Sequence, residues 1–131
     1  MACIEHLALW THDIERSTAF YVTYFGATPG NRYANTGKGF ESCFLSFGDG
    51  ARLEIMKTTA LAPVAIEAGA QRLGLAHFAL SVESARHVDE LTRRLANDGY
   101  PVLDGPRRTG DGYYESVILD PDGNRVEIAA S

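Results

Sequence analysis

The phrase Ile4-Glu5-His6-Leu7-Ala8-Leu9 recurs about 72 residues later as Leu75-Ala76-His77-Phe78-Ala79-Leu80. A second phrase, Asp49-Gly50-Ala51-Arg52-Leu53-Glu54-Ile55, recurs at nearly the same interval as Asp122-Gly123-Asn124-Arg125-Val126-Glu127-Ile128. Both copies of the first phrase carry a histidine, and both copies of the second carry a glutamate. The chain therefore reads as one module written twice, and an internal repeat of this kind determines the fold.

Each copy predicts the same order of elements. In the first copy a strand over 4–10 is followed by a helix over 14–25, which Asp13 begins as an N-cap and Gly26 ends. In the second copy Ser84 begins the helix and Gly99 closes it, at the place that Gly26 occupies in the first. The predicted strands are 4–10, 31–34, 40–47 and 52–56 in the first copy, and 75–82, 102–103, 113–119 and 125–129 in the second.

These elements predict an α+β fold built from two tandem βαβββ modules in a single domain over 1–131. Module one covers about 1–56 and module two about 74–131. The connector, about 57–73, has no counterpart in either module, and we expect a helical turn near 63–68 within it.

Composition narrows the class of partner. Among 131 residues, 45% are hydrophobic and 22% are charged, which is ordinary for a globular protein, and the net charge of −5 argues against nucleic acid as a partner. No segment approaches the roughly 20 apolar residues of a membrane span, and no secretory signal is visible, so we expect no membrane partner and a cytoplasmic location. Cys3 and Cys43 are expected to be buried free thiols.

Strand alternation places the polar repeats on one face of each sheet. Successive side chains of a strand point to opposite faces, so His6 shares a face with Trp10, and Glu54 shares one with Arg52 and Met56. The same holds for His77, and for Glu127 with Arg125, while the aliphatic neighbours point to the other face. The helix of each module can cover that aliphatic face, which leaves a cupped surface around a polar site.

Two imidazoles and two carboxylates, His6, Glu54, His77 and Glu127, form a ligand set for a divalent ion such as zinc, nickel or iron. A single strand histidine is more often a hydrogen-bonded structural residue, and a single strand glutamate is usually solvated. The recurrence of both types on the non-core face favours a metal site. Arg52 and Arg125 also recur, and they bind an anionic ligand or pair with carboxylates. Trp10, Met56 and Tyr114 are candidates to line the substrate pocket, or are ordinary packing residues.

Three phrases carry a resemblance to a known family: 13–21 (Asp-Ile-Glu-Arg-Ser-Thr-Ala-Phe-Tyr), 74–80 (Gly-Leu-Ala-His-Phe-Ala-Leu) and 120–127 (Asp-Pro-Asp-Gly-Asn-Arg-Val-Glu). With the duplicated module, they resemble the vicinal oxygen chelate superfamily, also called the glyoxalase/bleomycin-resistance/dioxygenase fold. The resemblance implies that the two modules curl their sheets into an open barrel with the helices outside. It also implies that His6, Glu54, His77 and Glu127 hold the metal, in a homodimer whose sites are completed within one chain or across two.

The ligand pattern separates branches of this superfamily. Bleomycin-resistance proteins lack the set, extradiol dioxygenases use two histidines and one glutamate, and methylmalonyl-CoA epimerases place glutamine where Glu54 stands. The order His-Glu-His-Glu resembles bacterial glyoxalase I, the lactoylglutathione lyase. However, the segments 39–47 and 107–114 do not resemble glutathione-binding regions, so the thiol adduct is left open.

We therefore expect a metal-dependent lyase or isomerase that acts on a small-molecule substrate, such as a thiol adduct. Zinc or nickel is the first choice of cofactor, with iron or manganese as alternatives. Glu127 would remove the proton beside a metal-chelated carbonyl, and Glu54 is its counterpart in the other module. The alternatives are a small-molecule-binding or antibiotic-resistance protein of the same fold and an acyl-CoA epimerase-like enzyme.

Overall fold

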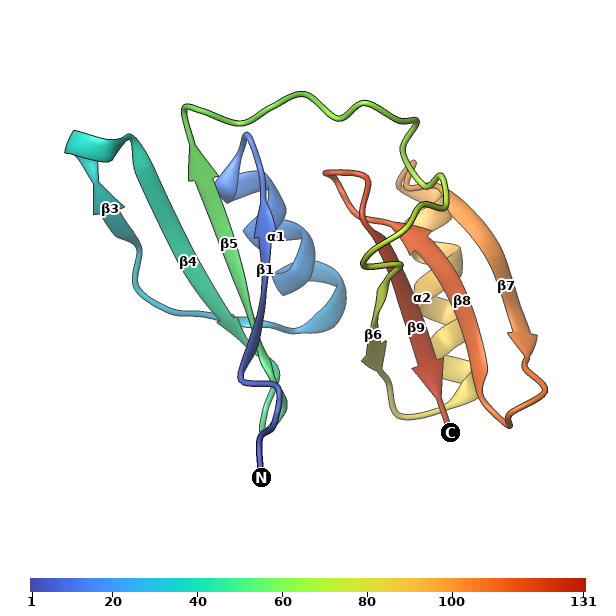
Figure 1. Ribbon diagram of the computed structural model, residues 1–131. Coiled ribbons are helices and arrows are strands. Elements are labelled where there is room, and N and C mark those ends of the chain that lie inside the picture. The colour runs from blue at the N-terminus through green and yellow to red at the C-terminus, as the bar shows by residue number, and fades with distance from the viewer. The chain divides into compact units, whose positions relative to one another are not determined.

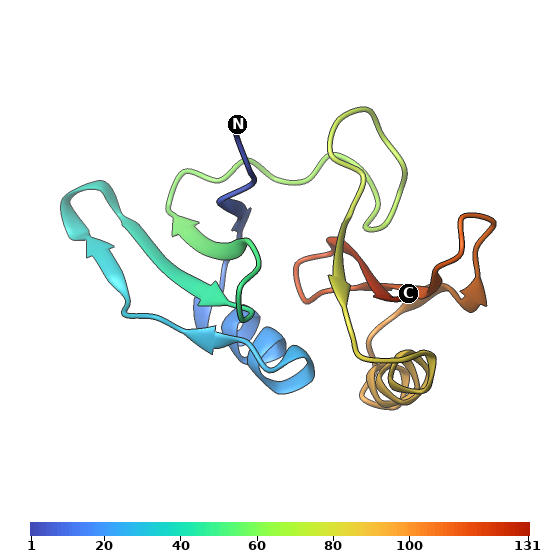
Figure 2. The same cartoon turned by 90° about the horizontal axis from the view of Figure 1, so that it is seen from below.

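The computed structural model describes residues 1–131 and shows two compact units, Met1–Pro63 and Val64–Ser131 (Figure 1). Each unit has one α-helix lying along one face of its own mixed sheet (Figure 2). The predicted α+β class, with two tandem βαβββ modules, is confirmed. Neither helix has the length and apolar character needed to cross a membrane.

The first unit forms a sheet in the order β1-β5-β4-β2, with β3 also paired to β4. The parallel pairing of β1 with β5 sets Ala8 opposite Glu54 and Trp10 opposite Met56. Its elements are β1 (His6–Trp10), α1 (Ile14–Phe25), β2 (Thr28–Pro29), β3 (Tyr33–Asn35), the short 3-10 helix η1 (Thr36–Lys38), β4 (Phe40–Ser46) and β5 (Arg52–Thr58).

The second unit repeats this plan in a sheet of order β6-β9-β8-β7. The parallel pairing of β6 with β9 sets Ala79 opposite Glu127, as Ala8 stands opposite Glu54 in the first unit. Its elements are β6 (Phe78–Ser81), α2 (Ala85–Asn97), β7 (Val102–Arg108), β8 (Tyr114–Leu119) and β9 (Arg125–Ala130).

Both helices begin as the sequence predicts. The Asp13 side chain accepts a hydrogen bond from the Arg16 backbone N–H at 3.0 Å, and the Ser84 hydroxyl accepts one from the His87 N–H at 3.2 Å. Helix α1 ends at Gly26, which adopts the left-handed conformation with φ 65° that glycine accepts most easily. Helix α2 ends at Asn97, two residues before Gly99.

Each helix buries its apolar stripe against one face of its sheet. In the first unit the core includes Ile14 and Tyr21 of α1 with Leu53 and Ile55 of β5. In the second unit the core residues of the helix and of strand β9 are Val88, Leu91, Leu95, Val126 and Ile128. The sheet face that carries the repeated histidines and glutamates is therefore the face that the helices leave uncovered.

Strand β7 departs from the sequence prediction. A short strand was expected at 102–103, yet β7 extends to Arg108, past Gly105 and Pro106. It does so as an edge strand with two register shifts, which is where a sheet tolerates proline. Glycine is required at 105, since φ is 77° and a Cβ would lie 2.5 Å from the Glu115 carbonyl oxygen.

Three further expectations are corrected. Strand β6 begins at Phe78 rather than at 75, so His77 stands just before it. The connector contains no helix near 63–68; its backbone instead turns at 67–70, where the Ala70 N–H bonds to the Glu67 carbonyl and Gly69 has φ 82°. Both cysteines are free, but only Cys43 is buried, while Cys3 is exposed.

Candidate functional site

In the first unit, the predicted ligands His6 and Glu54 meet on the uncovered face. His6 opens β1 and Glu54 lies in the neighbouring strand β5, which brings His6 Nε2 to 3.7 Å from Glu54 Oε1. The Phe44 ring stands edge-on to the imidazole with ring centroids 5.3 Å apart. Only 16% of the Glu54 side chain is exposed, so its carboxylate lies in a partly dry setting beside the imidazole.

The second unit repeats the arrangement more tightly. His77 Nε2 lies 3.0 Å from Glu127 Oε1, and 17% of the Glu127 side chain is exposed. Within each unit no group of three or more His, Cys, Asp or Glu side chains is arranged to hold a metal ion. The four predicted ligands are therefore present as two equivalent imidazole–carboxylate pairs, one in each unit.

The donors of each pair suit a metal ion by their chemistry and spacing. Imidazole nitrogens and carboxylate oxygens bind borderline divalent ions at about 2.1 Å, so two such ligands of one ion lie roughly 3 to 3.5 Å apart. The His77–Glu127 separation of 3.0 Å meets this spacing, and the His6–Glu54 separation of 3.7 Å is slightly wider. Each pair thus offers one nitrogen and one oxygen donor at a spacing close to that of two ligands of one ion.

Glu5 is a site residue that the sequence prediction missed. Its carboxylate contacts His6 Nδ1 and accepts a hydrogen bond from Arg52 Nε at 3.0 Å. The bond to His6, and after it the bond to Arg52, lowers the pKa of Glu5. Because Nδ1 is held in this way, Nε2 is the His6 nitrogen turned toward Glu54. The adjacency of Glu5 to the repeated histidine and the recurrence of Arg52 were the available signals.

The two repeated arginines differ in their partners. Arg52 pairs with Glu5, and its guanidinium carbon lies 4.1 Å from the centroid of the Phe44 ring, so for this residue pairing with a carboxylate is the alternative observed. Arg125 instead donates from Nη1 to the Gly69 carbonyl oxygen at 2.7 Å and forms no ion pair. Its Nε is buried without an acceptor.

Glu115 is a second residue that the sequence prediction missed. Val117 of β8 stands opposite Glu127, and alternation along β8 places Glu115 on the same face. Burial raises the pKa of Glu115, and the charge of Glu127 and a hydrogen bond between the two side chains raise it further. The Glu127 carboxylate therefore has His77 on one side and a second carboxyl group within hydrogen-bonding reach.

The three candidate pocket residues separate into two groups. Trp10 is 47% exposed and packs edge-on against Phe40 at 6.3 Å between ring centroids. It stands opposite the half-buried Met56, and alternation puts both on the face of His6 and Glu54.

Tyr114 is corrected. Its hydroxyl donates to Asp89 Oδ1 on helix α2 at 2.6 Å, and this bond raises the pKa of Tyr114. Tyr114 therefore lies on the helix side of its sheet, together with the buried Ser116 and Ile118, and not on the face of Glu127. The register of β8 decides this side, and the sequence phrase around Tyr114 was compatible with either.

Known proteins resemble the chain in fold across its length. A domain of the glyoxylase/bleomycin resistance protein/dioxygenase type from Frankia sp. EAN1pec is 18% identical with a TM-score of 0.81, covering 100% of this chain and 98% of that one. The trypanothione-dependent glyoxalase I of Leishmania major is 20% identical with a TM-score of 0.76, covering 98% and 86%. At these identities the likeness concerns the fold alone.

Sequence comparison finds one protein that is similar over part of the chain and one family model that matches nearly all of it. The uncharacterized protein YqjT of Bacillus subtilis is 42% identical over 62 residues, which is 45% of this chain and 48% of that protein, so the match spans about half of the relative's length. The model of the Glyoxalase/Bleomycin resistance protein/Dioxygenase superfamily matches residues 3–128, nearly the whole chain. The chain therefore belongs to the glyoxalase/bleomycin resistance protein/dioxygenase superfamily.

Proposed function

We propose that this protein is a metal-dependent lyase or isomerase of the glyoxalase I type, which transfers a proton beside a carbonyl group of a small molecule. One observation carries the proposal: each module brings one imidazole Nε2 close to one carboxylate oxygen, at 3.7 Å and 3.0 Å, on the face that its helix leaves uncovered. A relic of gene duplication needs only similar core and turn residues. The retention of both polar types in both modules instead supports a shared chemical task.

His6, Glu54, His77 and Glu127 would hold the ion, and their two nitrogens and two oxygens suit zinc or nickel first, with iron or manganese as alternatives. When bound, such an ion polarises a carbonyl oxygen of the substrate and makes the adjacent C–H more acidic. Neighbouring residues of the chain hold the His6 imidazole in position for metal binding. The Glu5 carboxylate holds His6 through Nδ1, and Phe44 packs against the His6 ring.

Glu127 is the residue that we assign to proton transfer. Its side chain is 17% exposed, so its carboxylate is poorly hydrated and suited to take a proton from carbon. A positioned base of this kind contributes about 10²–10⁴ in rate. Glu54, its counterpart in the first module, would return the proton to the neighbouring carbon. Trp10 and Met56 flank Glu54 on the same face and would contact the body of the substrate.

The glyoxalase I among the similar structures supports testing thiol-derived substrates first. Untagged protein should be purified and its metal content measured by elemental analysis, after which hemithioacetals and acyl-CoA thioesters are screened with each of the four metals. We expect one transition metal in stoichiometric amount and turnover that exchanges one substrate carbon-bound proton with solvent deuterium. A protein that takes up no metal, turns over none of these compounds and still binds small molecules would support the alternative of a binding protein.

A further inference from the structure

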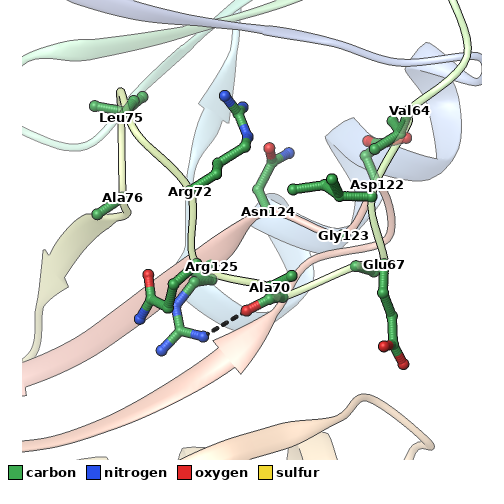
Figure 3. A pocket seen from close by; sticks show the side chains of 14 residues that line it. Val64, Glu67, Ala70, Arg72, Leu75, Ala76, Asp122, Gly123, Asn124 and Arg125 are labelled. Carbon is green, nitrogen blue, oxygen red and sulfur yellow. Dashed lines mark hydrogen bonds between the residues drawn. The ribbon is translucent and has the colours of Figure 1, made fainter.

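A cavity of about 220 Å³ lies within the second unit, between the connector and the turn that joins β8 to β9 (Figure 3). Connector residues 66–72 form one side of it, and Asp122–Arg125 form the other. Ala76, the residue before His77, also lines it. The cavity therefore adjoins the His77–Glu127 pair without including either residue.

The Arg125 guanidinium in the cavity wall lacks a carboxylate partner. Its one hydrogen bond runs from Nη1 to the Gly69 carbonyl oxygen at 2.7 Å, drawn dashed in Figure 3. Its Nε is buried and has no acceptor. A half-buried cation with an unsatisfied nitrogen is costly, and a negative group that approaches from the cavity would offset that cost.

In the first module the equivalent arginine has a carboxylate partner that Arg125 lacks. Arg52 occupies the same place in the repeat as Arg125, and it is neutralised by the carboxylate of Glu5. The counterpart of Glu5 in the second module is Ala76. Module two therefore has no side chain equivalent to the Glu5 carboxylate of module one. Ala76 and Arg125 both line the cavity.

The acidic residues around the cavity do not take that role. Glu67 and Asp122 line it, but Figure 3 shows both side chains well away from the Arg125 guanidinium. Asp104 lies close enough to interact with the Arg125 charge, but its carboxylate accepts its hydrogen bond from Arg107 Nε at 2.9 Å. Arg72, which also lines the cavity, contributes a second positive charge.

We propose that this cavity binds the carboxylate group of a small-molecule ligand, which occupies at Arg125 the position that the Glu5 side chain occupies at Arg52. Because Ala76 adjoins His77, a molecule held in this way would present its other end to the candidate ligand pair. If the proposed function holds, which this step assumes, the carboxylate site at Arg125 assigns the substrate to the class of small carboxylate-bearing molecules.

The test uses the full chain freed of metal and titrated with propionate, with propionamide as the uncharged isostere. Binding is followed in NMR spectra by the Arg125 Nε–H and Ala76 amide signals. We expect saturable shifts with propionate in the millimolar range and none with propionamide. Ala76→Glu, which restores the carboxylate of module one, should weaken propionate binding at least tenfold, as should Arg125→Gln. Arg93→Gln removes an exposed charge of α2 in the same module and should bind propionate as the parent does.

Equal binding of propionate and propionamide, or parent-like binding by Ala76→Glu with its amide spectrum intact, would overturn the proposal. The amide spectrum of Ala76→Glu shows whether the module still folds, so Arg125→Gln is not needed to decide the matter. Metal uptake by the same proteins is measured separately. A variant that loses propionate binding but takes up metal normally shows an effect on this cavity and not on the metal site. A parent protein that binds propionate but takes up no metal contradicts the proposed function and still supports the carboxylate site.

Discussion

Replacing His77 by alanine tests the metal assignment most directly. The His77 side chain is 41% exposed, stands just before β6 and faces Glu127 rather than the core, so its removal should change the stability of the metal-free protein by less than about 0.5 kcal/mol. Metal binding should respond very differently. Four-ligand zinc sites contribute about 10–16 kcal/mol, or about 2.5 to 4 kcal/mol per ligand, which corresponds to a loss of affinity on the order of a hundredfold.

That loss converts into a thermal shift. With free metal at about 100 times the parent's Kd, binding stabilises the parent by about 2.7 kcal/mol, while a hundredfold weaker variant gains only about 0.4 kcal/mol at the same metal concentration. The difference of about 2.3 kcal/mol corresponds to roughly 8 °C in Tm for a chain of 131 residues. The assay is thermal unfolding with and without zinc or nickel, together with a chelator competition that reads Kd.

His87→Ala is the matched control, because His87 lies on helix α2 in the same module and away from the ligand face. It should retain the parent's metal-induced shift. A His77→Ala protein that shows the full metal-induced shift of the parent would refute the assigned ligand set, since the proposed ion then has no need of this imidazole.

Further predictions concern catalysis, geometry, packing and assembly. Glu127→Gln at saturating metal should lose about 10²–10⁴ of turnover and of solvent-deuterium exchange, and parent-like rates would pass the role of base to Glu54. Glu5→Gln should lower metal affinity about tenfold by releasing His6 Nδ1, with Glu83→Gln, an exposed glutamate, left at the parent value; equal affinities would contradict the role of Glu5. Thr92→Val should cost about 1–3 kcal/mol in urea unfolding, because it strands the buried Ser116 hydroxyl that lies 2.7 Å from Thr92 Oγ1, and an unchanged midpoint speaks against this bond. On the family resemblance we expect a homodimer by light scattering at micromolar concentration, and a monomer there would oppose it.

Local sequence rules were enough to predict the fold and the pairing of His6 with Glu54 and of His77 with Glu127. Period-two alternation alone places Glu54 and Glu127 opposite the buried Leu53 and Val126, and the cap residues Asp13 and Ser84 begin the helices where predicted. These signals are strong because each depends on only a few consecutive residues, and the repeat provides each signal twice.

The residue that was assigned to the wrong face, and the two that the sequence prediction missed, depend on longer-range geometry. Tyr114 could stand on either face until the pairing of β8 with β9 was known, since a shift of one residue exchanges the faces. Glu115 gains its contact with Glu127 through the same pairing. Glu5 would point away from His6 in a regular strand, but β1 begins only at His6, and the preceding backbone lets the Glu5 carboxylate reach both His6 and Arg52.

The two modules have kept the same pair of donors while their surroundings have diverged. In module one the imidazole is held by an internal carboxylate, and Arg52 is neutralised by the same group. In module two His77 lacks that carboxylate because Ala76 replaces it, and Arg125 lines a cavity and bonds to a backbone carbonyl instead of a carboxylate. Catalysis needs the substrate to be held in a productive orientation beside fixed catalytic groups. On the proposed function, module one with its held imidazole would be the fixed part and module two with its cavity the part that receives the ligand, and we therefore propose Glu127 rather than Glu54 as the base.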